Sequence, residues 1–365
     1  MKILYDHQMF SLQKYGGISK YFCELLKNSP GKFKFNLSLL FSCNHYLKQD
    51  QYFFKKKMFP FPNASFKGKG FLENKVYFFN KWYSRHLISQ NNFDLFHPTF
   101  YDNYFFENLK KPYVITVHDL IAFKFKDSSY KAKMYQPLMT KIIKNAERII
   151  SISNNTKTDI IETFNINPEK IDVVYHGYNN PVIKPQKSIY GSYILFVGSR
   201  EGYKNFRIVV NAISNLLQSG NDIMLICVGE SFSGNEIAQF TKLKILNQVI
   251  ALRVDENSLN NLYANALLLV YPSLYEGFGM TILEAFANDC PVCLSDASCF
   301  PEIAGKAGVY FDPYDQESIL AAINKVIYNN TYRVQIVNLG KERLSEFSWS
   351  KTANQTVLSY KKALQ

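Results

Sequence analysis

The sequence predicts two α/β domains, each built on a parallel β-sheet with helices on both faces. Three observations support this fold class. Short apolar runs alternate with amphipathic helical patterns along the chain. The alternation stops at residues 179–192, which contain two prolines and a glycine, and then starts again. The chain has 365 residues, 47% of them hydrophobic, which is enough for two cores.

In the first half, strand patterns alternate with helix patterns. The run KILYDH opens the chain as a buried strand, and GGISKYFCELLKN follows as an amphipathic helix that begins at two glycines. Further strand patterns occupy residues 33–42, 93–99, 113–120, 148–153 and 170–177. Further helix patterns occupy residues 70–90, 129–146 and 155–164. Strands joined through helices pair in parallel, so we expect a sheet covered on both faces.

The second half repeats this order. Strand patterns occupy residues 193–199, 222–230, 248–255, 267–273, 291–296 and 308–312. Helix patterns occupy residues 205–220, 258–266, 280–289 and 315–329, with another candidate after residue 230 and helices at the end of the chain. The predicted organisation is a first domain (1–180), a linker (181–191), a second domain (192–345) and a C-terminal helix (346–365) that packs back on the first domain.

The ligand site of such a protein can be expected from its topology. Parallel sheets bind ligands outside the carboxyl ends of their strands, where the strand order reverses. With two such domains facing each other, we expect the site in the cleft between them.

The positive charge is confined to the first half of the chain. The net charge is +12 overall, but residues 1–185 carry +13 and the remainder carry −1. Within residues 51–85, eight basic residues stand against one acid, Glu73, and are interleaved with aromatics. This pattern favours an anionic membrane surface over a nucleic acid, and we expect no nucleic-acid partner. A solvated lysine-rich face is the structural alternative.

Several classes of protein and site are disfavoured. No apolar run approaches the ~20 residues of a transmembrane helix, and MKILYDHQMF is typical of a core strand rather than a signal peptide. The six cysteines form no disulfide framework, as expected for a cytoplasmic protein. Cys290 and Cys293 form a CxxC pair, but their apolar context favours core packing over metal or redox chemistry.

Two segments of the first half carry candidate site residues. Gly16 and Gly17 lie between the first strand and its helix, where glycines let a ligand approach the backbone and a helix N-terminus attracts anions. A tight turn would explain these glycines equally well. His118 ends the apolar strand 113–117 at the ligand edge of the sheet, although it could also be hydrogen-bonded into its loop. His97 and His176 are weaker candidates of the same kind.

The first strand of the second half leads into a possible diphosphate site. This strand ends at Gly198, and Arg200 and Lys204 follow in the loop before the next helix. Arg can hold a diphosphate bidentately, while Lys acts as a point charge. The structural alternative is two solvated loop charges.

The stretch LYEGFGMTILEAFANDCPV contains two glutamates eight positions apart. Glu276 stands in a turn, and Glu284 lies about one turn into a helix that starts near Met280. The backbone N–H groups at this helix start can bind an anion or a sugar hydroxyl. They belong to Phe278, Gly279, Met280 and Thr281. A partly buried Glu284 needs a partner, which could be a lysine, a backbone donor or the hydroxyls of a ligand.

Taken together, these segments resemble glycosyltransferase family 4, the retaining glycosyltransferases of GT-B fold with two Rossmann-like domains. The resemblance spans nearly the whole chain. It rests on GGIS, TVHDL, FVGSREGYKN, the E-x7-E of Glu276 and Glu284, and PEIAGKAGVYFDP.

The resemblance implies a role for each matching residue. In such enzymes the second domain holds the nucleotide. Glu284 matches the residue that binds the ribose hydroxyls, and Arg200 and Lys204 match the cations on the diphosphate. Glu276 and the backbone of Phe278, Gly279 and Met280 match the group that holds the donor sugar. Arg253 and Val254 occupy the region that reads the base, Gly17 matches a loop near the phosphates, and His118 matches a residue near the sugar.

The function implied is retaining transfer from a nucleotide-sugar donor without a metal or other cofactor. GDP-mannose is the preferred donor by resemblance. The acceptor would be a glycan or a lipid-diphosphate-linked oligosaccharide of O-antigen or polysaccharide synthesis, with the protein peripheral on the cytoplasmic face of the inner membrane. Two alternatives stay open: a sugar-nucleotide epimerase of the same fold, and a non-catalytic, membrane-associated glycan-binding protein. A retaining glycosidase is disfavoured, because its two carboxylates must face each other across one bond.

Overall fold

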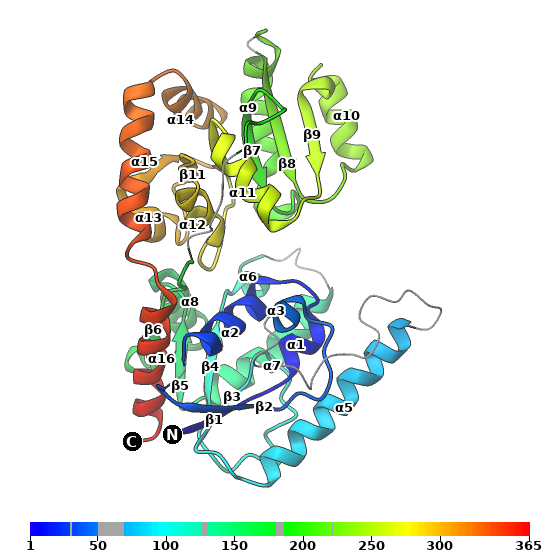
Figure 1. Ribbon diagram of the computed structural model, residues 1–365, viewed down its shortest axis with the longest axis vertical. Coiled ribbons are helices and arrows are strands. Elements are labelled where there is room, and N and C mark those ends of the chain that lie inside the picture. Colours follow the sequence, from blue (N-terminus) through cyan, green and yellow to red (C-terminus); the bar gives the residue numbers. More distant parts are fainter. Residues whose placement is uncertain (30, 50–68, 126–129, 180–185, 221) are drawn as a thin grey trace. The chain divides into compact units, whose positions relative to one another are not determined.

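The computed structural model describes residues 1–29, 31–49, 69–125, 130–179, 186–220 and 222–365 (Figure 1). The chain forms two compact units. The first comprises Met1–Gly177 together with Trp349–Gln365, and the second comprises Tyr178–Ser348. All pairings between the described strands are parallel in both units, which confirms the predicted α/β fold class.

The first unit contains two three-stranded sheets, ordered β2-β1-β3 and β4-β5-β6. Their strands are β1 (Lys2–Tyr5), β2 (Lys34–Leu37), β3 (Leu95–His97), β4 (Val114–Val117), β5 (Arg148–Ser151) and β6 (Ile171–Val173). A parallel bridge between Phe96 and Tyr113 connects the two sheets. The combined order is therefore 2-1-3-4-5-6, and it reverses between β1 and β3. Topology thus places the ligand edge of this unit in the loops after those two strands.

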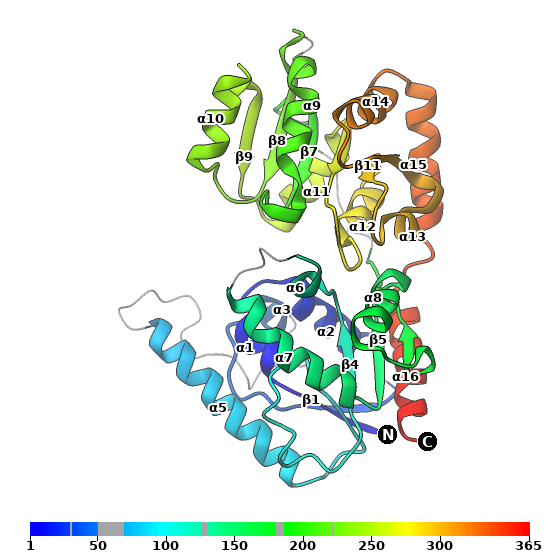
Figure 2. The ribbon, with the colours of Figure 1, turned by 180° about the vertical axis from the view of Figure 1, so that it is seen from behind.

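Helices surround these sheets (Figures 1 and 2). They are α1 (Gln8–Leu12), α2 (Gly17–Lys27), α3 (His45–Gln49), α5 (Lys69–Ser89), α6 (Ile121–Lys124), α7 (Tyr130–Asn145), α8 (Asn154–Phe164), the 3-10 turn η1 (Pro168–Lys170) and α16 (Trp349–Ala363). The last of these, α16, belongs to the first unit although it ends the chain. Thr352 Oγ1 donates to the carbonyl of Tyr175, and Ser359 Oγ donates to Asp172.

Strand β2 is shorter than the strand predicted over residues 33–42. It ends at Leu37, and the backbone N–H groups of Leu40 and Phe41 donate to Asn80 Oδ1 at 2.9 and 3.2 Å. A side chain of α5 therefore takes donors that the sequence pattern assigns to the sheet ladder. The local sequence does not predict this early strand end, because Asn80 lies about forty residues away in the chain.

The second unit has one six-stranded sheet in the order β12-β11-β10-β7-β8-β9. Its strands are β7 (Ser192–Val197), β8 (Ile223–Val228), β9 (Val249–Leu252), β10 (Leu268–Tyr271), β11 (Val292–Ser295) and β12 (Gly308–Phe311). The order reverses between β7 and β10. Their apolar side chains are buried, as expected for a sheet covered on both faces.

The helices of the second unit begin with clear local signals. Ser233 and Glu236 form a capping box at the start of α10, and Asp255 caps α11 through Ser258 N–H. The helices are α9 (Phe206–Gln218), α10 (Gly234–Lys242), α11 (Glu256–Asn265), α12 (Met280–Ala287), α13 (Phe300–Ala304), α14 (Gln316–Ile327) and α15 (Asn330–Leu344). Short 3-10 turns are η2 (Gly202–Lys204), η3 (Leu246–Gln248) and η4 (Gly305–Ala307). None of the helices in the described ranges has the length and apolarity that crossing a membrane demands.

Candidate active site

The loops after β7 and β10 meet where the strand order of the second unit reverses. The N–H of Leu274 donates to the carbonyl of Tyr203 at 2.8 Å and joins the two loops. Lys204 Nζ lies 2.6 Å from Glu276 Oε1, and both side chains are largely shielded from solvent. The fold thus brings together two candidate residues that are 72 positions apart in the sequence.

Two tyrosines surround the Lys204 ammonium group. Its nitrogen lies 5.2 Å from the ring centre of Tyr203 and 5.7 Å from that of Tyr271. Burial, and then the neighbouring Glu276 carboxylate, raise the pKa of Tyr271 well above its ordinary value, so this phenol stays protonated. Tyr271 was not among the predicted site residues, although its position at the end of an apolar strand could have indicated it.

Helix α12 starts beside this ion pair. Its N-cap is Gly279, with φ of +83°, and no side chain caps the helix. A Cβ at Gly279 would lie 3.1 Å from Ile282 Cδ1 and 3.3 Å from Phe300 Cε1, so both the backbone angle and the space favour glycine. Met280 and Thr281 form the first turn. The helix therefore directs its positive end toward the Glu276 loop, where an anion can bind.

The turn that carries Glu276 is fixed by Ser298. The Ser298 hydroxyl accepts a hydrogen bond from Glu276 N at 3.1 Å and donates one to Glu276 O at 2.8 Å. Ser298 itself has a φ of +55°. The carboxylate of Glu276 therefore stands on a backbone held from two directions, which suits a group that must orient a ligand.

Glu284 is half-buried and has a tyrosine partner. Its Oε2 accepts a hydrogen bond from Tyr263 Oη of α11 at 2.9 Å. Burial, and then Glu284, raise the pKa of Tyr263 well above its ordinary value, which keeps its hydroxyl a donor. From the sequence we expected a lysine, a backbone donor or ligand hydroxyls as the partner of Glu284, and Tyr263 was not predicted.

Arg200, predicted to hold the diphosphate together with Lys204, is engaged by other groups of the second unit. Its Nε lies 2.5 Å from Glu236 Oε1, and its Nη2 donates to the carbonyls of Glu230 and Ser231. The guanidinium also stacks 4.8 Å from the ring centre of Phe232, and its side chain is only 5% exposed. Arg200 therefore ties the loop after β7 to the start of α10, whereas Lys204 faces Glu276.

Gly198 lies where the loops after β7 and β8 approach closely. Its φ is +121°, and its N–H donates to the carbonyl of Val228. A Cβ at Gly229 would lie 2.8 Å from the Gly198 carbonyl oxygen. Gly229 was not among the predicted site residues, but this close approach of two backbones leaves no space for a side chain at its position.

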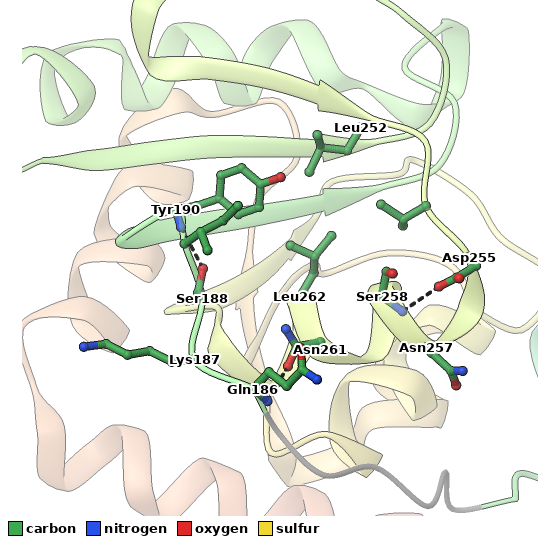
Figure 3. Close-up of a pocket in the computed structure, with 12 residues that line it drawn as sticks. Gln186, Lys187, Ser188, Tyr190, Leu252, Asp255, Asn257, Ser258, Asn261 and Leu262 are labelled. Carbon is green, nitrogen blue, oxygen red and sulfur yellow. Dashed lines mark hydrogen bonds between the residues drawn. The ribbon is translucent and has the colours of Figure 1, made fainter.

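Val254 and Arg253 occupy different surroundings. Val254 lines a cavity of about 660 Å³, whereas Arg253 is exposed and pairs with Glu230. Figure 3 shows this cavity between the segment 186–190 and α11. The N–H groups of Gln186 and Ser188 donate to Asn261 and Asn265, which fix that segment on the helix. The cavity is not lined by Lys204, Glu276 or Glu284.

In the first unit, Gly16 and Gly17 open helix α2. Gly16 is its N-cap, and a Cβ there would overlap the Gln13 side chain at 2.3 Å. That space lets Gln13 Oε1 accept from Ser19 N–H at 3.1 Å and cap the first turn of the helix. Nothing lies within 4 Å of a Cβ added at Gly17. Gln13 therefore belongs to this loop, although the sequence analysis did not name it.

His118 follows β4 and is buried against aromatic rings. Its ring packs edge-on against Tyr21 at 5.1 Å, with His176 at 5.8 Å. Its Nε2 has no hydrogen-bond partner among the described residues. Burial lowers the pKa of His118 to about 3, so the ring is neutral near pH 7. A neutral imidazole with an open nitrogen can bind a ligand hydroxyl.

His97, in contrast, is fully engaged in the core. Its Nδ1 lies 2.6 Å from Tyr360 Oη, and its Nε2 lies 3.0 Å from Thr116 Oγ1. Cys290 and Cys293 are buried free thiols, and burial raises the pKa of Cys290 to about 12. Within the described part of the chain, no cluster of three or more His, Cys, Asp or Glu side chains is arranged to hold a metal ion.

A polar cluster that the sequence analysis missed lies at the strand reversal of the first unit. Asp6, after β1, accepts hydrogen bonds from Thr99 N and Oγ1, after β3, at 2.8 and 2.6 Å. Gln8 joins Asp6 to the backbone of Asp102. Burial raises the pKa of Asp6 and outweighs the hydrogen bonds with Thr99 and Gln8, which lower it.

Helix α5 completes this cluster from its inner side. Lys81 Nζ and Tyr77 Oη lie 2.7 and 2.8 Å from Asp102 Oδ2. Hydrogen bonds with Lys81 and Tyr77 outweigh burial and lower the pKa of Asp102. The cluster therefore presents a carboxylate, an ammonium group and a phenol in partly exposed positions, a combination suited to sugar hydroxyls.

Two family models match this chain. The model described as "Glycosyl transferases group 1" matches residues 183–343, and the model described as "Glycosyltransferase Family 4" matches residues 53–180. Among curated proteins, the O-antigen chain mannosyltransferase RfbU of Salmonella typhimurium is 29% identical over 215 residues. That match covers 58% of this chain and 60% of the Salmonella protein. The O-antigen chain mannosyltransferase B of Escherichia coli is 26% identical, over 71% of this chain and 72% of that protein.

Solved structures share the fold across the chain. Anabaena Alr3699/HepE, solved in complex with UDP and glucose, matches with a TM-score of 0.73 and 18% identity, over 99% of both chains. A glycosyltransferase from Rickettsia africae matches with a TM-score of 0.72 and 18% identity, over 100% of this chain and 98% of that one.

Proposed function

Because this chain belongs to glycosyltransferase family 4, whose members have the GT-B fold, we propose that it is a retaining glycosyltransferase. It would move a sugar from a nucleoside-diphosphate donor to a glycan acceptor. The observation that carries the proposal is the Lys204–Glu276 pair beside the open start of α12, where the strand order of the second unit reverses.

Different residues of the second unit would bind different parts of the donor. We assign Lys204 to the diphosphate, the start of α12 and Glu276 to the sugar hydroxyls, and Glu284 to the ribose. A cation and a helix N-terminus both stabilise negative charge, which develops on the diphosphate as it leaves. Arg200 is given a positioning role, because Glu236 and two carbonyls already occupy its guanidinium.

The reaction is a substitution at the anomeric carbon. The bond from that carbon to the diphosphate oxygen breaks, and the acceptor hydroxyl oxygen bonds to the same face of the sugar. The departing phosphate accepts the hydroxyl proton, so no protein nucleophile is required. In the first unit, we assign to a substrate hydroxyl the Nε2 of His118, a buried atom with no hydrogen-bond partner among the described residues. Since Lys204 supplies the positive charge, no metal is required.

GDP-mannose is the proposed donor. Support comes from the two bacterial relatives, which are described as O-antigen mannosyltransferases. The test is to incubate the protein with GDP-mannose, UDP-glucose and other nucleotide sugars and to measure release of the nucleoside diphosphate. We expect turnover with GDP-mannose that EDTA leaves unchanged. The proposal would be refuted if the protein turned over none of the nucleotide sugars, whether or not glycans were added.

The acceptor is proposed to be a lipid-diphosphate-linked oligosaccharide of O-antigen or polysaccharide synthesis. The first unit would bind it at the cluster of Asp6, Lys81 and Asp102, and the enzyme would work at the cytoplasmic face of the inner membrane. The epimerase alternative is distinguished by the products. An epimerase releases a free altered sugar or an altered donor, whereas a transferase joins the sugar to an acceptor with unchanged anomeric configuration, which NMR reads directly.

A further inference from the structure

Helix α5 has its polar and apolar residues in unusual places. The middle of its inner face is polar, before the buried Ile88: Asn80 and Ser84 are fully buried, Asn80 is bonded to the 40–41 backbone, and Ser84 Oγ lies 2.6 Å from Ser38 Oγ. Its outer face carries Phe78, Phe79 and Trp82, which are 68%, 58% and 64% exposed. A surface helix normally has the opposite arrangement.

These three aromatic residues form one surface. Positions i, i+1 and i+4 lie on the same side of a helix. The Trp82 ring stacks on His86 at 6.1 Å, which extends the surface by one turn toward the C-terminus of the helix. Both ribbon views show α5 along the edge of the first unit (Figures 1 and 2). Contiguous exposed aromatic residues on a folded protein mark an interaction surface.

We propose that this aromatic face of α5, formed by Phe78, Phe79 and Trp82, inserts into the interface of an anionic lipid bilayer. The positive charge of the first half of the chain favours an anionic bilayer over a second copy of the chain as the partner. Residues 1–185 carry a net +13, and Lys75 and Arg85 are exposed on α5 itself. A second copy of the chain would meet the same positive charge, whereas an anionic leaflet attracts it. Tryptophan and phenylalanine rings with flanking basic residues are typical of the membrane–water interface.

The surface also fits the proposed acceptor, and on this point the inference rests on the proposed function. The inner-face residues Tyr77 and Lys81 hold Asp102 of the acceptor cluster, one helix turn or less from the outer aromatics. A helix that enters the bilayer interface on one side would therefore bring the cluster close to a lipid-linked substrate. The remaining basic and aromatic residues of the segment 51–85, residues 51–68, lie outside the described part of the chain.

Tryptophan fluorescence tests the proposal directly. The chain has two tryptophans, Trp82 on this face and Trp349, which is buried. On mixing with vesicles of phosphatidylglycerol and phosphatidylcholine, we expect a blue shift and quenching by brominated lipid tails. Phosphatidylcholine vesicles alone, or high salt, should weaken both signals. The variant Phe78→Ser/Phe79→Ser/Trp82→Ser should bind vesicles at least about tenfold more weakly in a sedimentation assay.

A matched control separates this face from general hydrophobicity. Tyr314, Val334 and Ile237 of the second unit are also exposed, and their triple replacement by serine should leave vesicle binding unchanged. Equal binding by the α5 variant and the control would overturn the proposal. So would absence of vesicle binding together with a dimer that the α5 variant disrupts, since the occupant would then be a second copy.

Failure of the proposed function has a different signature. If no nucleotide sugar is turned over but Trp82 still enters anionic vesicles, the membrane-surface proposal is supported and the proposed enzyme activity is refuted. Conversely, transfer to a water-soluble acceptor with no vesicle binding retains the enzyme and overturns the membrane surface. The α5 variant should keep transfer to such an acceptor, because its three residues contact no proposed substrate group.

Discussion

At the scale of single residues, the proposed chemistry depends on a shielded ion pair. Removing either Lys204 or Glu276 leaves the other charge in a poorly solvated place, and for buried pairs this costs several kcal/mol. In the proposed complex, the bound donor would offer both groups a new partner, its diphosphate contacting Lys204 and its sugar hydroxyls contacting Glu276. The pair is therefore poised to be exchanged for substrate contacts.

Glu276 and Glu284 should give different defects when each is changed to glutamine. Glu276→Gln should lower kcat by about a hundredfold with little change in nucleotide affinity, because it removes charge beside the reacting sugar. Glu284→Gln should weaken nucleotide binding by about tenfold, because it removes a charged hydrogen-bond acceptor. Steady-state kinetics and calorimetry with the nucleoside diphosphate measure the two effects. The same defect in both variants would contradict the division of roles.

Arg200 provides a second residue-scale prediction. If it positions the loop after β7 through Glu236, then Arg200→Ala and Glu236→Gln should lower the free energy of unfolding similarly, by about 1–3 kcal/mol. The double variant should be little worse than either single one. A large loss of diphosphate affinity in Arg200→Ala with none in Glu236→Gln would restore the direct role expected from the sequence.

The side-chain partners of Arg200 and Asp6 are the clearest examples of contacts that the sequence does not predict. The loop after β7 could be identified as a candidate site because it follows a strand end, and Lys204 and Glu276 were both predicted from the sequence. The partner of Arg200 lies 36 residues away on α10, and that of Asp6 lies 93 residues away after β3. No local period encodes such pairs, so the choice between Arg200 and Lys204 needed the fold.

At the scale of elements, periodicity located the strands and helices but not their ends. The helix expected over residues 129–146 is observed as Tyr130–Asn145, although Pro137 lies inside it. The strand expected over residues 33–42 stops at Leu37, and Asn80 takes the N–H donors of Leu40 and Phe41. Helix α1 was not expected, since five residues are too few to show a helical period.

Helix α16 is anchored by a buried hydrogen-bond network. Tyr360 Oη lies 2.5 Å from Tyr5 Oη and 2.6 Å from His97 Nδ1. Tyr360→Phe should therefore lower the free energy of unfolding by about 2–4 kcal/mol, because it leaves two buried polar groups without this partner. Urea unfolding followed by the fluorescence of Trp349, on the same helix, measures this. Tyr314→Phe, at an exposed tyrosine, is the control and should change nothing.

At the scale of the whole molecule, titration should affect the two units differently. All six histidines lie in the first unit. Burial lowers the pKa of His7, His97 and His118 to about 3, from an ordinary value of 6.5, and also holds the pKa of His176 well below that ordinary value. Below pH 6.5 the unfolded state therefore binds more protons than the folded state at these positions.

The first unit should consequently lose stability as the pH falls from about 6.5 toward 3. Each buried histidine lowers the free energy of unfolding as the pH falls through this window, and the raised pKa of Asp6 opposes the trend. Both tryptophans report on this unit, so urea midpoints from tryptophan fluorescence at pH 7.5 and 5.0 measure the effect. A midpoint at pH 5.0 equal to or above that at pH 7.5 would contradict the account.

We propose that the second unit binds a nucleoside diphosphate at Lys204, and calorimetric titration with GDP measures this binding. We expect GDP to bind the unaltered protein and to bind Lys204→Ala about a hundredfold more weakly, consistent with removal of a charge-assisted contact. Arg207→Ala, which removes a cation of the same unit near the start of α9, should bind GDP normally. Equal GDP affinity in the unaltered protein and in Lys204→Ala would contradict the account.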